Sequence, residues 1–279
     1  MPDLPCLLLF TKPARAGRVK TRLIGAEVGG RRLDAADAAA LHAASLGDLA
    51  ERLALGAGHA FRLRVAWDLA PGEPLPAPPP ELAGRPGVDA VRQRGCGLGE
   101  RLFAALADAA REHPLVAAVG SDHPTLPLAT VERSFAALAE GDGDVALGPS
   151  HDGGYYLIAL APRALSPRLF AEIDWSSEWV RGQTLERCSE LGLRVVELPP
   201  GRDIDRGDDV AALAADIAAA EAVGGAGEAP DCPRARALLA RWGLLPGAVS
   251  SLHGEAKKRS SAVSGTSAPT AGAPLVPPP

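Results

Sequence analysis

The chain has 279 residues, which is enough for one large α/β domain or for a domain followed by a tail. Charged residues make up 23% of the sequence and the formal net charge is −5, so the composition argues against nucleic acid as a partner. No apolar run is long enough to cross a bilayer, and the N-terminus lacks a signal-peptide pattern. We therefore expect a cytoplasmic protein without membrane association.

Apolar runs bounded by turn residues recur along the chain and predict the strands of a sheet. They lie at residues 4–10, 59–67, 88–93, 114–120, 143–149, 154–160 and 193–199. Stretches of helical periodicity lie at 28–55, 97–113, 127–140 and 177–191. Strands that alternate with helices indicate a mostly parallel sheet covered on both faces. Only a Gly-rich turn separates 143–149 from 154–160, so we expect an antiparallel or irregular excursion there.

The composition divides the chain into three parts. Residues 1–222 hold the alternating pattern and predict one domain, which includes a Pro-rich surface loop at 69–87. Residues 223–249 are interpreted as a linker and a short C-terminal helix. Residues 250–279 are rich in Ser and Pro and have few apolar anchors, so we expect a disordered tail. The four cysteines form no C-x-x-C pair, which indicates free thiols rather than a zinc site or a disulfide framework.

The segment "TKPARAGRVKTRLIG", residues 11–25, concentrates positive charge directly after the first predicted strand. Gly17 would allow close approach of the backbone to a ligand, and Lys20 and Arg22 supply charged donors that suit a phosphate. The segment is not a Walker A loop, because its glycine and lysine spacing does not match. Two interpretations stay open: a cradle for a polyphosphate, or a solvated basic loop.

Two acidic segments also follow predicted strands. In "AAVGSDHPTLP", residues 117–127, Asp122 could hold Mg²⁺ against nucleotide phosphates, or it could cap the next helix. In "GRDIDRGDD", residues 201–209, Asp203 and Asp205 are spaced to share one face of an extended segment. Asp208 or Asp209 suits the first turn of the following helix, where the helix dipole favours an acid.

Two glycine-rich segments complete the candidate set, although each is a weak signal alone. "QRGCGLGERL", residues 93–102, is a turn that opens a helix and includes Gln93 and Gly99. "GPSHDGGYYLIAL", residues 148–160, places Asp152 before a tight Gly-Gly turn and before Tyr155. The alternative for the second segment is an ordinary hairpin turn with one tyrosine in the core.

The order of these motifs, with "IDWSS" before the last one, resembles the bacterial DUF2064 family over about three quarters of the chain. Members of that family are described as glycosyltransferase-A-fold proteins, and many are labelled as glycosyltransferases, including some assigned to arsenosugar biosynthesis. The family is more distantly similar to the 2-phospholactate and molybdenum-cofactor guanylyltransferases. The resemblance implies α/β architecture: a single Rossmann-like, three-layer α/β/α catalytic domain of the nucleotide-diphospho-sugar transferase type over residues 1–222, with a mixed, mostly parallel sheet.

The resemblance also implies roles for matching residues. A metal, Mg²⁺ or Mn²⁺, would bind Asp122 and Asp205, and the catalytic residues would be Asp122, Asp152 and Lys20. The nucleotide or its phosphates would bind Arg15, Gly17, Lys20, Arg22, Gln93 and Gly99. The acceptor or sugar would bind Asp152, Gly153, Gly154 and Tyr155. The chain departs from the family pattern at Gly97, where an Asp is usual, and at Arg206, where a Thr is common.

Three functions fit these features. The first is metal-dependent glycosyl transfer from a nucleotide sugar to a small-molecule acceptor, with the metal stabilising the departing diphosphate. The second is nucleotidyl transfer from an NTP to a phosphorylated small molecule, which the basic loop favours because a triphosphate needs more positive donors. The third is a non-catalytic nucleotide-binding protein on the same fold. The family resemblance ranks glycosyl transfer first, and the sequence does not indicate an oligomeric state.

Overall fold

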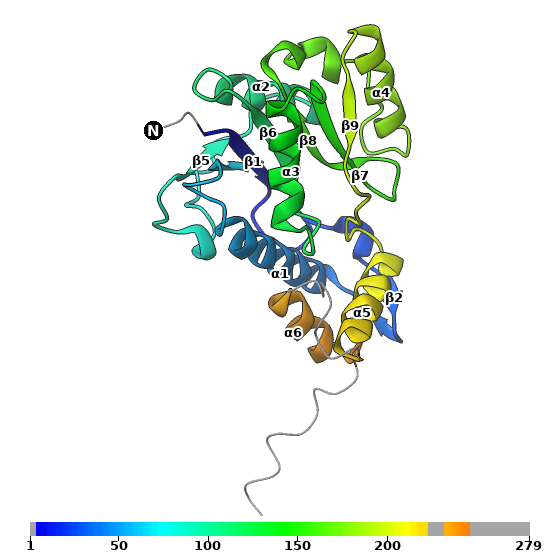
Figure 1. The fold of residues 1–279 in the computed structure, drawn as a ribbon. Helices are drawn as coiled ribbons and strands as arrows, with labels where there is room; N and C mark the ends of the chain where they lie inside the picture. The colour runs from blue at the N-terminus through cyan, green and yellow to red at the C-terminus, as the bar shows by residue number, and fades with distance from the viewer. Residues whose placement is uncertain (1–3, 223–231, 246–279) are drawn as a thin grey trace, which may run out of the picture. The chain divides into compact units, whose positions relative to one another are not determined.

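The computed structural model describes residues 4–222 and 232–245. Its main feature is a seven-stranded sheet with the order β5-β4-β1-β6-β8-β7-β9 (Figure 1). The strands are β1 (Cys6–Thr11), β4 (Arg62–Trp67), β5 (Val88–Arg92), β6 (Val116–Gly120), β7 (Val145–Pro149), β8 (Tyr155–Leu160) and β9 (Val195–Glu197). Only β8 runs against its neighbours in this sheet. Each predicted apolar run contains one of the strands, and the antiparallel excursion is confirmed at β7–β8.

The predicted helices are present, and one of them is shorter than expected. They are α1 (Ala35–Leu53), α2 (Leu98–Ala109), α3 (Leu128–Ala139), α4 (Val180–Glu190), α5 (Gly207–Ala222) and α6 (Pro233–Arg241). Single 3-10 turns lie at η1 (Thr21–Leu23), η2 (Pro80–Leu82), η3 (Pro162–Ala164) and η4 (Pro167–Phe170).

The prediction of a helix over 28–55 was wrong at its start. Residues 27–32 form a small antiparallel hairpin of β2 (Glu27–Val28) and β3 (Arg31–Arg32). Gly29 and Gly30 both have positive φ, which a tight turn requires and a helix does not allow. Asp34 then starts α1 with a capping box. Its side chain accepts a hydrogen bond from the backbone nitrogen of Asp37, and the Asp37 side chain accepts one from the backbone nitrogen of Asp34.

The sheet is covered on both faces, which confirms the three-layer α/β/α prediction. Alternate residues of β1 point to opposite faces, so Leu9 and Leu8 belong to different buried clusters. Helices α1 and α3 pack on the face of Leu9, whereas α2 and α4 pack on the face of Leu8. The buried members from α1, α3, α2 and α4 include Leu49, Phe135, Leu106 and Cys188.

A third apolar cluster joins α5, α6 and the β2–β3 hairpin to the outer side of α1. Helix α6 is docked by Asp48 of α1, whose carboxylate accepts from the backbone nitrogens of Arg234 (2.9 Å) and Ala235 (2.8 Å). The remainder of the predicted linker, residues 223–231 and 246–249, and the predicted tail at 250–279 lie outside the described residues. The proposed division into three parts therefore stays a prediction.

The topology places the candidate motifs at one edge of the sheet. β1 pairs with β4 on one side and with β6 on the other, so the order of strands reverses direction at β1. Ligands of open α/β sheets bind beyond the carboxyl ends of strands at such a switch point. Within residues 4–222 and 232–245, no helix combines the length and apolar character needed to cross a membrane.

Candidate active site at the carboxyl edge of the sheet

A cavity of about 1110 Å³ opens at the carboxyl ends of the central strands. Residues from each of the five candidate segments line it, although these segments are far apart in the sequence. The predicted site residues on its wall are Lys20, Arg22, Gln93, Asp122, Asp152, Gly154, Tyr155 and Asp205. Arg15, Gly17, Gly99 and Gly153 do not line it. The fold thus gathers eight of the twelve predicted residues around one space, and the other four lie behind or beside its wall.

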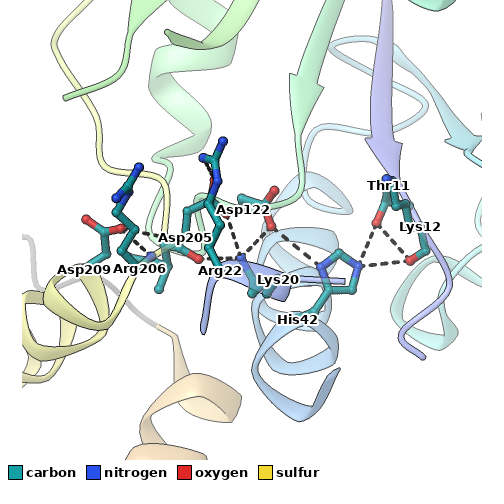
Figure 2. A network of polar contacts seen from close by, with 10 residues as sticks. Thr11, Lys12, Lys20, Arg22, His42, Asp122, Asp205, Arg206 and Asp209 are labelled. Carbon is teal, nitrogen blue, oxygen red and sulfur yellow. Dashed lines mark hydrogen bonds and ion pairs between the residues drawn. The ribbon is translucent and has the colours of Figure 1, made fainter. Parts of the chain in front are cut away.

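Lys20 is the centre of the polar network in the cavity (Figure 2). Its Nζ donates to Asp122 Oδ1 at 2.6 Å and to the Ile204 carbonyl at 2.6 Å, and lies 3.9 Å from Asp205 Oδ1. The backbone of Lys20 is left-handed (φ 45°, ψ 43°), which costs a non-glycine residue free energy and is typical of functional sites. Its side chain is only 1% exposed, so the ammonium is held rather than solvated.

Asp122 follows β6 and lies on the cavity wall rather than at a helix cap. Helix α3 starts after Pro127 without any side-chain capping bond, so the capping alternative is wrong. Burial by itself would raise the pKa of Asp122, but the charge of Lys20 and the nearby His42 outweigh burial and lower that pKa well below its ordinary value. Asp122 is therefore ionised at neutral pH.

His42 of α1 is a site residue that the sequence motifs do not reveal. Its Nδ1 lies 3.7 Å from Asp122 Oδ1, and its Nε2 lies 3.0 Å from the Lys12 carbonyl (Figure 2). A carbonyl oxygen can only accept, so the hydrogen bond to Lys12 fixes a proton on Nε2. A single histidine inside a helical stretch carries no sequence signal of its own, and α1 brings it to the site only in the folded chain.

The late acidic motif brings Asp203 and Asp205 to the same cavity, as their spacing predicts. Asp209 lines the cavity as well, and it also caps the start of α5 by accepting from the backbone nitrogens of Asp205 (3.1 Å) and Arg206 (2.7 Å). Burial and the neighbouring charges of Asp122, Asp205 and Asp152 raise the pKa of Asp203 to about 7. Burial, followed by the charge of Asp122, also raises the pKa of Asp205. The cavity therefore carries more negative charge than its residues neutralise.

The donor set of the predicted metal site has the chemistry of a magnesium site but not that of a closed protein cage. Among the residues that the structure describes, no group of three or more His, Cys, Asp and Glu side chains is arranged to hold an ion. Asp122 and Asp205 lie on either side of the Lys20 ammonium instead. Mg²⁺ commonly binds one or two carboxylates together with water and substrate phosphates, so two acids on a cavity wall would fit it once phosphates were bound beside them.

The D-G-G-Y turn is built by close backbone packing. Gly153 has φ +91°, and a Cβ there would lie 2.2 Å from the carbonyl oxygen of Glu178. Arg181 N also donates to the Gly153 carbonyl at 2.9 Å, which joins the turn to the start of α4. Asp152 Oδ1 accepts from Gly154 N at 3.0 Å and so shapes the turn. Glycine is required at 153 because of this positive φ and because of the close approach of Glu178. The turn joins the antiparallel strands β7 and β8, and Tyr156 is buried, so the alternative of a hairpin turn with one core tyrosine also describes it.

The remaining predicted residues have supporting positions. Arg15 is exposed and forms an ion pair with Glu73, and Gly17 has φ +76° with open space around it. Gly99, in the first turn of α2, allows the Trp175 indole to approach, because a Cβ there would lie 2.7 Å from Trp175 Nε1. Gly99 therefore supports the cavity wall through Trp175, whereas Glu73, the partner of Arg15, does not line the cavity.

The side of the cavity near β4 and β5 combines residues of the "QRGCGLGERL" segment with Asp68, which no motif included. Gln93 Nε2 donates to the Ala66 carbonyl at 2.8 Å, which fixes the start of the "QRGCGLGERL" segment. Asp68, directly after β4, lies 3.2 Å from Lys12 Nζ and 3.0 Å from Arg101 Nη1. Asp68 and Arg101 both line the cavity, and a lone acid after a predicted strand was the available signal for Asp68.

Comparisons with known proteins agree with this fold. The family model of DUF2064, described as an uncharacterized protein conserved in bacteria, matches residues 59–177, which confirms the resemblance found in the motifs. A crystal structure from Desulfovibrio desulfuricans G20, provisionally described as a nucleotide-diphospho-sugar transferase, is 28% identical with a TM-score of 0.68. That match covers 86% of this chain and 96% of the other. No curated protein matches the sequence.

Two more distant structures show similarity only at low TM-scores. A cytidylyltransferase from Leptospira borgpetersenii is 11% identical, with 89% of this chain and 99% of the other covered and a TM-score of 0.48. Glucosyl-3-phosphoglycerate synthase from Mycobacterium tuberculosis is 12% identical, with 72% and 71% covered and a TM-score of 0.43. Both likenesses are too distant to carry functional information.

Proposed function

We propose that this protein is a transferase that acts on a nucleotide-activated donor, and that it moves a glycosyl group from a nucleotide sugar to a small-molecule acceptor. The observation that carries the proposal is the buried Lys20 ammonium, held among carboxylates at the switch point of the sheet. The 28% identical structure described as a nucleotide-diphospho-sugar transferase supports this class of donor.

The phosphates of the donor would bind the basic side of the cavity. Lys20 supplies a point charge, and Arg22, whose side chain is 45% exposed, supplies a planar donor that matches two phosphate oxygens. Both cations already face the Asp205 carboxylate. A phosphate that binds there would replace this carboxylate as the anion next to Lys20 and Arg22. These residues would stabilise the charge that develops on a leaving diphosphate.

Asp122 and Asp205 are the residues that would hold Mg²⁺ or Mn²⁺ beside those phosphates. A bound divalent ion supplies Lewis-acid stabilisation of phosphoryl oxygens. Asp122 is suited to this task because Lys20 and His42 keep its carboxyl ionised. Burial, and after it the charge of Asp122, raises the pKa of Asp205, and a cation in its vicinity would lower that pKa.

Asp152 would serve the acceptor. It is exposed on the cavity wall and held at the start of the D-G-G-Y turn by its bond with Gly154 N. A carboxylate in that position can accept the proton of an acceptor hydroxyl and orient the oxygen for attack. Gly153 and Gly154 keep the backbone compact there, and Tyr155 closes the wall behind it.

Nucleotidyl transfer from an NTP is the second candidate, and one observation favours it. Lys20, Arg22 and Arg206 all line the cavity, and three cations suit a triphosphate with pyrophosphate as the leaving group. The family resemblance implies a Thr where Arg206 stands, so this chain carries a positive charge there that the family pattern does not. The same acids would hold the metal in both reactions.

One experiment separates the two reactions. The protein is incubated with Mg²⁺ and either NTPs or nucleotide sugars, with and without candidate acceptors, and the products are identified. Release of a nucleoside diphosphate from a nucleotide sugar is the expected result. Pyrophosphate release from an NTP would contradict glycosyl transfer. Consumption of neither class, together with the absence of any nucleotide-dependent thermal shift, would reject both reactions.

Asp122→Ala tests the metal proposal within that assay. We expect metal-dependent turnover to be abolished, because Asp122 is an ionised carboxylate on the cavity wall. Asp108→Ala is the matched control, since Asp108 forms an ion pair with Arg94 and does not line this cavity. Full activity of Asp122→Ala would remove Asp122 from the mechanism.

A further inference from the structure

The loop between η4 and α4 forms one wall of the cavity. Five consecutive residues of this wall loop line the space: Trp175, Ser176, Ser177, Glu178 and Trp179. The sequence places them in and after the "IDWSS" motif, to which the proposed function gives no role. A continuous stretch on the wall of a ligand cavity is a candidate for substrate contact.

The wall loop is held in one conformation by its own bonds. Asp174 and Gln183 exchange two 2.8 Å bonds, from Asp174 N to Gln183 Oε1 and from Gln183 Nε2 to Asp174 Oδ2. Ser177 Oγ donates to the Asp174 carbonyl at 2.6 Å. Ser176 has φ +69°, a conformation that costs a non-glycine residue free energy and is often stored at functional sites. The loop is therefore pre-organised, at some cost in stability.

The wall loop is also fixed relative to the proposed phosphate and acceptor residues. Arg22 Nη2 donates to the Ser176 carbonyl at 3.3 Å. On the other side, the backbone of Glu178 packs against Gly153, where no Cβ would fit. The side chains of 175–179 thus have a defined position between the basic loop and the D-G-G-Y turn.

The two tryptophans of the wall loop differ in their surroundings. Trp175 is packed, because its ring meets the Tyr155 ring edge-on at 6.4 Å and its indole lies against Gly99. Trp179 lines the same cavity but is 62% exposed. Leaving an indole in water forgoes the stabilisation that burial would give, so an exposed tryptophan on a cavity wall, carried by a loop whose backbone is held in place, is suited to contact with a ligand.

We propose that Trp179 is a stacking platform for a sugar-like ring of the substrate, and that the acceptor supplies this ring; the proposal rests on the proposed function. A pyranose or cyclitol ring has an apolar C–H face that suits the negative face of an indole, and a rim of hydroxyl groups. Asp152, Glu178 and Ser177 line the cavity nearby and can accept or donate hydrogen bonds to such hydroxyls. Asp152 and Glu178 disfavour a phosphate at this end. Gln93, one of the six predicted nucleotide residues, belongs to the β4–β5 side, and Arg22, another of them, contacts the wall loop through the Ser176 carbonyl.

The test uses the full chain labelled with 5-fluorotryptophan, because the four tryptophans give separate ¹⁹F signals whatever the activity. Trp179→Phe identifies the signal of Trp179. Trp242 is the internal control, since its ring packs under the Arg31 guanidinium at 5.5 Å and does not line the cavity. The probes are UDP, GDP, CDP and ADP, the matching nucleotide glucoses, methyl α-D-glucopyranoside, methyl α-D-mannopyranoside and myo-inositol. Each glycoside is titrated with and without the nucleoside diphosphate that binds tightest.

We expect at least one free glycoside or the inositol to shift the Trp179 signal, with no shift of Trp242. Trp179→Ala should weaken that ligand by about three- to tenfold, the range for an aromatic stacking contact, and leave the affinity of the nucleoside diphosphate unchanged. If only the nucleotide sugar shifts Trp179, the ring belongs to the donor and the assignment to the acceptor is overturned. If the nucleoside diphosphate alone shifts Trp179, the indole stacks on a base and the sugar proposal is overturned.

A Trp179 signal that responds to no probe also overturns the proposal. This failure is distinct from failure of the proposed function, because binding of the nucleoside diphosphates is measured separately in Trp179→Ala. If these bind and Trp179 is silent, the platform alone is wrong. If no nucleotide binds either protein, the proposed function is wrong, and the titrations without nucleotide still decide whether Trp179 contacts a sugar.

Discussion

Two clusters of charged side chains in this protein have similar residue types and different surroundings. The docking cluster is Asp48 and Glu51 of α1, Glu81 of η2 and Arg234 of α6. The site cluster is Lys20, Asp122, Asp203 and Asp205 at the carboxyl edge of the sheet. Each cluster contains one charged side chain that is almost fully removed from water, Asp48 at 0% and Lys20 at 1% exposure. A charge in such surroundings is costly unless it is paired.

The neighbours of the acids distinguish the two clusters. Burial raises the pKa of Asp48, and the neighbours reduce that shift without cancelling it: the backbone bonds from Ala235 and Arg234, and the Arg234 side chain. For Asp203, burial and three neighbouring acids all raise the pKa, and Lys20 alone opposes them. The docking cluster is internally satisfied, as expected for a structural role. The site cluster is incomplete without a further cation or ligand, as expected for a functional role.

Among the substitutions that test this difference between the two clusters, Lys20→Met should have the largest effect. Removing a buried donor aimed at developing phosphate charge should lower turnover of the donor by about 10²- to 10³-fold. The variant also leaves Asp122 without its closest cation, so turnover is compared at equal folded fraction, measured by circular dichroism and thermal unfolding.

Lys12→Met is the matched control for Lys20→Met. Lys12 lies on the same cavity, but its side chain is 51% exposed and pairs with Asp68 at 3.2 Å. We expect Lys12→Met to lower turnover by less than about tenfold, since an exposed ion pair contributes little free energy. Equal losses in the two variants would show that general positive charge, rather than the held Lys20 ammonium, matters.

Asp48→Ala tests the docking cluster in the opposite way. The side chain of Asp48 is fully buried and accepts two backbone bonds at the start of α6. Removing this carboxylate should lower the free energy of unfolding by about 2–3 kcal/mol, because α6 loses its cap and the buried backbone nitrogen of Ala235 is left unpaired. Specific activity of the folded fraction should be unchanged, as measured by urea unfolding together with the donor-consumption assay. A loss of activity without a loss of stability would contradict the structural assignment.

The sequence predicted the sheet well because burial on both faces leaves a local record. Runs such as residues 114–120 are apolar throughout and are bounded by turn residues, and each forms one strand. Lys20, Asp122 and Asp205 could be grouped as well, because each follows or precedes an element whose carboxyl edge is the binding edge. The fold then needed only to bring three strand ends together.

What could not be predicted depends on contacts between distant segments. His42 reaches Asp122 from the middle of α1, and the Gly29–Gly30 turn interrupts a stretch whose composition favours a helix. The docking role of Asp48 depends on a helix 186 positions later in the chain. The difference between Trp175 and Trp179 is one of exposure alone, and residue type does not encode it.

Asp203→Asn should change the free energy of unfolding by the smallest amount, and it tests most directly whether the crowded acids of the site cluster destabilise the fold. The pKa of Asp203 in the folded protein is about 7, whereas an unperturbed carboxyl titrates near 4, so the folded state retains the proton over this interval. The stability of the wild type should therefore decline as pH rises from about 4 to 7, by roughly 1–2 kcal/mol after solvent screening. Asn has no charge to bury, so the stability of the variant should match that of the wild type below about pH 4 and exceed it at pH 8.

Urea unfolding with a chelator present measures this difference in stability, and added Mg²⁺ should then raise the stability of the wild type if these acids bind a cation. Identical pH profiles would mean that the crowded acids at this edge cost the fold nothing, and the contrast between the two clusters would not hold.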